Sequence, residues 1–350
     1  MASTTPPDWY QGNDSAYNPA QLTQYLTFLG LPPFSHPPSV SLEYLNQLFT
    51  HQITALPYEN LSIHYSPSHS ISLSPSILFH KMISQNRGRG GYCMELSLLF
   101  HHVLRALGFP VYLSGVRIRA RVNGVPSGPY IGFVHLVNIV TLSKGQRYAL
   151  DIAFGGDGPT LPMPLIPGLV HHNSIGTQEI RYIHEFIPGQ RFREDGGNKC
   201  WIYQYRNSPK KEWNSYYAFD AQHEMYEGDF ANLSYYISQS PNSHQSYTPL
   251  VVKFFRGPET ERDEKTGEER ERVKVVGKAM LVNGEVKKNL TGKTEVVKIC
   301  QTEEERVEIL KELFGIELTE EERGAIKGWR AELCEDGERR VGEWIGRGMV

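Results

Sequence analysis

Hydrophobic residues recur at every third or fourth position through most of the first hundred residues, which is the spacing of one face of a helix. This pattern predicts helices at Ala20–Leu29 and Ser41–Ile53. A third helix is predicted from Ser74 as its N-cap through Met82, with Pro75 at its first position. The first region of the chain is therefore expected to be mainly helical.

From Pro110 onward, apolar and polar residues alternate, which is typical of strands. The segments with this pattern are Val111–Ala120, Ile131–Leu142, Arg147–Phe154, Glu179–Ile187 and Cys200–Arg206. Two more helices are predicted near the C-terminus, where capping boxes pair Thr302 with Glu305 and Thr319 with Glu322. The middle of the chain is thus expected to be mostly strand, followed by a mixed region.

Composition and charge restrict the classes of protein that fit this pattern. The chain has 350 residues, of which 39% are hydrophobic and 11% aromatic, as in a folded protein of about two or three domains. With a net charge of -3, the chain lacks the positive electrostatic field that non-specific nucleic-acid binding needs, so no nucleic-acid partner is expected. It has no signal-like start and no apolar run of about 20 residues, so we expect neither secretion nor a membrane partner. The mixed-charge run Glu259–Glu271 is interpreted as a hairpin tip or surface loop.

The cysteines and histidines give little sign of a metal or a disulfide framework. None of the four cysteines belongs to a CxxC pair; they are Cys93, Cys200, Cys300 and Cys334. The pairs His101-His102 and His171-His172 lack the spacing of a zinc site. We therefore expect no metal, no permanently bound cofactor, and reduced thiols in the cytoplasm.

Cys93 stands out because a glycine-rich run precedes it and a buried helix pattern follows it. Apolar residues recur at helical spacing after Cys93 until Gly108 and Pro110 end the pattern. The positive end of a helix stabilises a thiolate, and Arg87 and Arg89 add positive charge nearby. A buried structural cysteine fits Cys93 about equally well when this residue is considered alone.

A predicted hairpin brings a histidine and a carboxylate to the same region. The loop Ser143-Lys144-Gly145 joins two strand patterns and places Gly145 where a left-handed conformation is needed. In the register centred on Lys144, His135 lies opposite Ala153. Asp151 is then a diagonal neighbour of His135 on the same face, at roughly 7 to 8 Å, which side chains can bridge.

Cys93, His135 and Asp151 would form a nucleophile, base and orienting carboxylate if the Cys93 helix packs against this face. Considered alone, His135 is better explained as an ordinary strand histidine and Asp151 as a strand-end residue. Only the combination favours catalysis over these structural roles.

The same segments resemble the arylamine N-acetyltransferase family. The resemblance lies in three segments: Arg89-Gly90-Gly91-Tyr92-Cys93-Met94-Glu95-Leu96, Val134-His135-Leu136-Val137 and Leu150-Asp151-Ile152-Ala153-Phe154-Gly155. Further similarity occurs at Leu56–Leu61 and Ser238–Pro241, so the resemblance covers most of the chain.

The resemblance implies an α+β fold with a cysteine-protease-like Cys-His-Asp core. Its parts would be an N-terminal helical domain (1–109), a central antiparallel β-barrel domain (110–230) and a C-terminal α/β lid (231–350). It assigns Cys93 as nucleophile, His135 as base and Asp151 as orienting carboxylate. It also implies the following supporting residues: a buried ion pair of Glu59 with Arg89, Phe154 and Tyr58 at the amine pocket, and Gly132 near the acyl donor.

The implied activity is ping-pong transfer of an acyl group from acetyl-CoA, or another acyl-CoA, to an arylamine or arylhydrazine, in xenobiotic metabolism. The same three residues would also serve a papain-like or transglutaminase-like amide hydrolase, which is the alternative from another class. A malonyl donor would favour a nearby arginine, and Arg117, Arg119 and Arg121 alternate along one strand. We interpret these three as a solvated strand face. The preferred donor, the natural amine and the oligomeric state are left open by the sequence.

Overall fold

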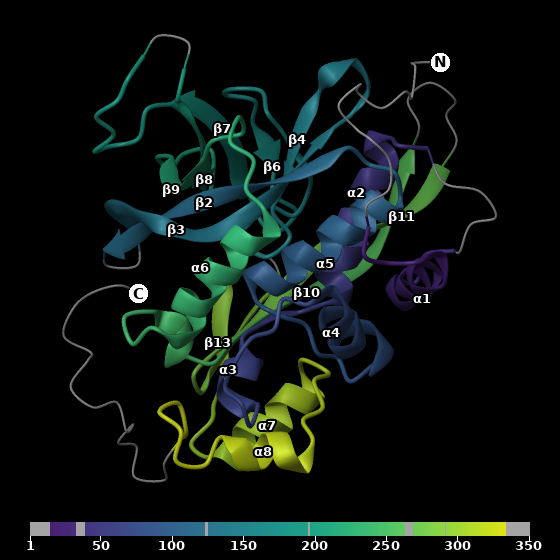
Figure 1. Ribbon diagram of the computed structural model, residues 1–350, viewed down its shortest axis with the longest axis vertical. Coiled ribbons are helices and arrows are strands. Elements are labelled where there is room, and N and C mark those ends of the chain that lie inside the picture. Colours follow the sequence, from purple (N-terminus) through teal and green to yellow (C-terminus); the bar gives the residue numbers. More distant parts are fainter. Residues whose placement is uncertain are drawn as a thin grey trace.

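The computed structural model describes residues 15–32, 39–122, 125–194, 197–262, 269–290 and 292–333. Two antiparallel sheets lie on either side of a central helix, and the remaining helices pack around them (Figure 1). The chain therefore has the α+β organisation that the sequence predicts. Cys334 and residues 263–268 of the mixed-charge run lie outside the described residues.

The helices predicted in the first region are present. They are α1 (Pro19–Leu29), α2 (Leu42–Ala55), α3 (Leu61–Tyr65), α4 (Pro75–Phe79) and α5 (Cys93–Ala106). Ser41 caps α2 by accepting a hydrogen bond from Tyr44 N. Ser74 is the N-cap of α4 and Pro75 its first residue, as predicted, although the Ser74 side chain makes no capping hydrogen bond. The helix continues past Phe79 as a π-helix over His80–Ser84, which includes Met82.

The larger sheet is built from the middle of the chain, in the order β5-β4-β3-β2-β9-β8-β7-β6. Its strands are β2 (Val111–Val122), β3 (Val125–Thr141), β4 (Arg147–Leu150), β5 (Met163–Pro164), β6 (His171–His172), β7 (Glu179–Glu185), β8 (Cys200–Arg206) and β9 (Asn214–Phe219). The strand predicted to run to Phe154 ends four residues earlier, at Leu150. The apolar residues after Asp151 belong to a loop that packs beside β3.

The smaller sheet joins distant parts of the chain, in the order β1-β10-β11-β12-β13. Its strands are β1 (Tyr58–Glu59), β10 (Leu250–Arg262), β11 (Glu269–Val282), β12 (Glu285–Asn289) and β13 (Thr294–Ile299). The two described ends of the mixed-charge run, 259–262 and 269–271, belong to the paired strands β10 and β11, in agreement with the hairpin interpretation. The short strand β1, which precedes α5 in sequence, pairs with β10 through Tyr58 and Val252.

Three helices complete the fold: α6 (Glu227–Gln239), α7 (Glu303–Glu312) and α8 (Glu320–Ala325). The capping box predicted for α8 is present, with Thr319 and Glu322 exchanging hydrogen bonds. At α7 Thr302 caps Glu305 N, but the Glu305 carboxylate accepts from Gln301 N instead of completing the box.

The main hydrophobic core surrounds α5. Leu104 of α5, Leu136 of β3 and Phe254 of β10 belong to one buried cluster, although they come from the three predicted domains. Figure 1 shows α5 in the middle of the molecule, with β2 and β3 on one side and β10 on the other. The apolar stripe that predicted this helix is therefore buried, with β2 and β3 packed against α5 and α2 packed against β10 and β11. None of the helices in the described part of the chain combines the length and the apolar character that a membrane span requires.

Candidate active site

Cys93 is the first residue of α5 and is buried at the junction with β3. Its Sγ lies 3.9 Å from the backbone oxygen of Val134, the residue before His135. The helix start is fixed locally, because Tyr92 N donates to the Glu95 carboxylate over 3.1 Å. Sγ therefore lies at the N-terminal, positive end of the α5 dipole.

The hairpin that presents His135 has the register predicted from its loop. Thr141 pairs with Arg147 and Asn138 with Leu150, which centres the turn on Lys144. Both Lys144 and Gly145 adopt a positive φ, of 63° and 72°, although only the glycine was expected to do so.

Asp151 meets His135 even though β4 has already ended. The Nε2–H of His135 donates to Oδ1 of Asp151 over 2.9 Å, and both side chains are buried. The same Oδ1 accepts from the backbone N–H of Ala153 over 3.3 Å, which orients the carboxylate. The pair predicted from strand geometry is therefore present, with the carboxylate carried by a loop instead of a strand.

The electrostatics of the site favour a charged imidazole. Burial alone would lower the pKa of His135, but the charge and hydrogen bond of Asp151 outweigh it. A hydrogen bond with Cys93 adds to them, and the pKa of His135 rises to about 10. A protonated His135 beside Cys93 supplies the positive partner that a thiolate needs.

Asn138 links α5 to β3 and was not identified from the sequence. Its Nδ2 donates to the backbone oxygen of Ser97 over 3.0 Å, and its Oδ1 lies 3.0 Å from Nδ1 of His101. These bonds fix the cysteine helix against the histidine strand. The available signal was a polar amide within a strand of otherwise apolar residues, since buried amides need partners.

Glu59 and Arg89 form a buried ion pair beneath the loop that leads to Cys93. Arg89 Nε and Glu59 Oε1 are 3.0 Å apart, and Gly90 N donates to the same oxygen over 3.2 Å. Burial would raise the pKa of Glu59, but the charges of Arg89 and Lys81 lower it below its usual value. The carboxylate is therefore ionised and joins strand β1 to the loop that leads to Cys93.

Two of the three predicted substrate residues lie beside the site. The ring of Phe154 packs edge-on against His135, with centroids 5.3 Å apart. Burial and then the electrostatic effect of the nearby Cys93 raise the pKa of Tyr58. The Tyr58 hydroxyl accepts a hydrogen bond from Gln245. Gly132 lies on β3, exposed, and a Cβ there would meet no atom within 4 Å. The structure thus places Phe154 and Tyr58 at the site and Gly132 at an open position nearby.

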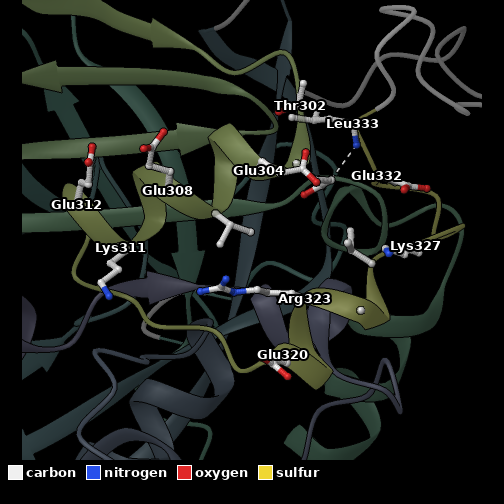
Figure 2. A pocket seen from close by; sticks show the side chains of 14 residues that line it. Thr302, Glu304, Glu308, Lys311, Glu312, Glu320, Arg323, Lys327, Glu332 and Leu333 are labelled. Carbon is white, nitrogen blue, oxygen red and sulfur yellow. Dashed lines mark hydrogen bonds between the residues drawn. The ribbon is translucent and has the colours of Figure 1, made fainter.

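A groove of about 1110 Å³ occurs elsewhere, between α7 and α8 (Figure 2). The charged side chains of Lys311 from α7 and Arg323 from α8 extend into the space between the two helices. None of its lining residues belongs to the cysteine site.

Comparison with known proteins decides the family. The sequence pattern of a family described as N-acetyltransferase matches residues 41–257, which include Cys93, His135 and Asp151. The chain belongs to the arylamine N-acetyltransferase family.

Relatives and solved structures of the family agree with this assignment. The chain is 28% identical to N-malonyltransferase FDB2 of Fusarium pseudograminearum over 90% of this chain and 93% of that one. It is 30% identical to the protein of that name from Gibberella moniliformis, over 77% and 76% of the two chains. The fold matches the Mycobacterium marinum arylamine N-acetyltransferase in complex with CoA at a TM-score of 0.67 and 24% identity, over 89% of this chain and 99% of that one. The protein is thus an acyltransferase of the arylamine N-acetyltransferase family with the cysteine-protease-like fold.

Proposed function

We propose that the protein transfers an acyl group from acyl-CoA to the nitrogen of an arylamine or arylhydrazine through a thioester on Cys93. The observation that carries this proposal is the meeting of Cys93, His135 and Asp151 where α5 packs against the β3–β4 hairpin. A thiolate nucleophile, a base and an orienting carboxylate are the groups that such a transfer needs.

In the first half-reaction, the Cys93 thiolate attacks the thioester carbonyl of acyl-CoA. A bond forms between Sγ and the acyl carbon, the bond from that carbon to the CoA sulfur breaks, and the CoA thiolate takes the proton of His135. The enzyme then holds a thioester, so the acyl group stays activated for a second transfer.

In the second half-reaction, the amine nitrogen attacks this acyl-enzyme. The new C–N bond forms as the C–S bond to Cys93 breaks, and neutral His135 accepts the proton of the amine. This restores the thiolate and the protonated imidazole. Asp151 holds the ring orientation throughout and stabilises its positive charge.

Two acyl donors are candidates, acetyl-CoA and malonyl-CoA. Acetyl-CoA is the donor that the family name implies. Malonyl-CoA is favoured by the relatives named N-malonyltransferase, which match three quarters of this chain or more. The enzyme is incubated with an equal mixture of the two donors, and the mass of the acylated protein is measured by mass spectrometry. The acetyl and malonyl adducts differ in mass, so the preferred donor can be identified.

Release of CoA in the absence of amine tests the proposed function. Wild-type enzyme mixed with acyl-CoA alone should release about one CoA per active site in a burst, followed by slow hydrolysis. Cys93→Ser should give no burst, whereas Cys200→Ser, at a cysteine outside the site, should match the wild type. A peptide amidase of the papain or transglutaminase type would show no burst with acyl-CoA, and intersecting initial-rate lines without a burst would contradict the ping-pong order.

A cytoplasmic location also belongs to this proposal. A catalytic thiol has to stay reduced, and reducing compartments maintain it in that state.

A further inference from the structure

The loop that leads to the cysteine, Arg87–Tyr92, is held by the C-terminal part of the chain. We call it the cysteine loop. The backbone oxygen of Arg87 accepts from Glu317 N over 2.9 Å, and Arg87 Nη1 donates to Glu317 O over 2.9 Å. The segment around Glu317, which lies between α7 and α8, therefore pairs directly with the beginning of the cysteine loop.

Glu322 of α8 adds a carboxylate that bridges both arginines of the cysteine loop. Its Oε2 lies 2.6 Å from Arg87 Nη1 and its Oε1 lies 2.5 Å from Arg89 Nη1. The side chain of Glu322 is 14% exposed and that of Arg89 is 2% exposed, so water screens these contacts little. Charge-assisted bonds to a planar guanidinium fix its orientation as well as its position.

The contacts of Arg89 carry this restraint toward Cys93. The guanidinium of Arg89 binds Glu322 through Nη1 and Glu59 through Nε. Glu59 Oε1 in turn accepts from Gly90 N, three residues before Cys93. A continuous chain of short, buried contacts thus runs from α8 to the backbone that sets the start of α5.

We propose that Glu322 is a positioning residue that holds the cysteine loop in the conformation in which Cys93 meets His135. The inference rests on the proposed role of Cys93. Glu322 lies beyond residue 257, where the family pattern ends, so this restraint is supplied by the chain's own C-terminal region. Its carboxylate touches no reacting atom and acts through Arg87 and Arg89.

The substitution Glu322→Gln isolates this role. Glutamine serves as well as glutamate at the third position of a capping box, so the bond with Thr319 N can be kept while the charge is lost. Thr319→Ala is the matched control for helix stability, because it removes the cap of α8 without removing the charge that the arginines contact. Glu320→Gln controls for the charge itself, since Glu320 is exposed on the groove of Figure 2.

Two measurements report on the position of Cys93: steady-state acyl transfer and the rate of its alkylation by iodoacetamide. Glu322→Gln should lower kcat by about 10- to 100-fold with little change in KM for acyl-CoA, because a small misplacement of a reacting group carries a cost of this order. Alkylation of Cys93 should slow in step. Thr319→Ala and Glu320→Gln should keep wild-type values at temperatures well below their unfolding transitions.

Three results would decide against the proposal. Wild-type kcat and alkylation in folded Glu322→Gln would remove Glu322 from this role. Equal losses in Glu322→Gln and Thr319→Ala would assign the effect to the stability of α8. If Glu322→Gln does not fold, Arg87→Gln tests the same bridge at its partly exposed end, and wild-type kcat there would overturn it. An active Cys93→Ser would instead contradict the proposed function, which separates the two failures.

Discussion

At the scale of single residues, His135 determines the charge state of the site. It contacts Asp151 on one side and Cys93 on the other, and its ring packs against Phe154. Because the imidazole is buried, its positive charge depends on the Asp151 carboxylate. Loss of that carboxylate should therefore affect both catalysis and the pH dependence of stability.

Asp151→Asn should give a folded protein whose kcat is lower by about 10⁴-fold. An amide cannot stabilise an imidazolium, and it favours the wrong tautomer of the ring. Steady-state acyl transfer measures the loss, and circular dichroism checks the fold. Asp220→Asn, which removes a carboxylate outside the site, should leave kcat unchanged. Near-wild-type turnover in Asp151→Asn would remove Asp151 from the catalytic set.

The raised pKa of His135 predicts how stability changes with pH. The pKa of the imidazole is about 6.5 when the chain is unfolded. It is about 10 when the chain is folded. The folded state binds this proton more tightly, so the stabilisation is complete below about pH 6.5 and is lost as the pH rises through about 10. Urea unfolding between these limits should show a steeper fall in unfolding free energy for wild type than for Asp151→Asn. Parallel curves would mean that His135 is not held in its charged form.

At the scale of elements, the cysteine loop is packed so closely that glycine is required in it. Gly88 has a φ of 69°, and a Cβ at this position would come within 1.8 Å of the backbone oxygen of Gly315. Gly145, in the turn between β3 and β4, has a φ of 72° but no atom within 4 Å of such a Cβ. The two glycines share a backbone conformation and differ in their surroundings.

Gly88→Ala should therefore destabilise the protein much more than Gly145→Ala. Each alanine pays about 1 to 2 kcal/mol for the left-handed backbone, but only Gly88→Ala also forces the C-terminal segment away from the cysteine loop. Denaturant unfolding gives the difference in free energy, and alkylation of Cys93 should slow in Gly88→Ala alone. Equal losses of stability would show that the close approach of Gly315 relaxes without cost.

The elements near the site were largely predictable because their signals are local. The stripe of apolar residues after Cys93 predicts α5, and the loop around Lys144 sets the register that brings His135 toward Asp151. The end of β4 at Leu150 was not predicted, because Ile152 and Phe154 continue an apolar pattern although they belong to a packed loop. A hydrophobic pattern reports burial, and burial does not distinguish a strand from a loop that packs on the core.

At the scale of the whole molecule, the site depends on contacts between distant parts of the chain. Strand β1 pairs with β10 through Tyr58 and Val252, and Glu322 reaches the arginines of the cysteine loop. Such contacts leave no periodic pattern in the sequence. Each depends on a few residues that lie about two hundred positions apart in the chain. None of these long-range contacts is predicted by the sequence pattern. The ion pair of Glu59 with Arg89, whose residues are 30 positions apart, was expected only from the family resemblance.

Isolation of the acyl-enzyme tests the central claim most directly. The enzyme is mixed with acyl-CoA, quenched in acid, digested and analysed by mass spectrometry, with a parallel sample chased with arylamine before the quench. The account predicts one acyl group on the peptide that carries Cys93, its disappearance on the chase, and formation of an equal amount of acylated amine. An enzyme that acylates the amine at the same rate with no acyl group on Cys93 at any time would contradict it.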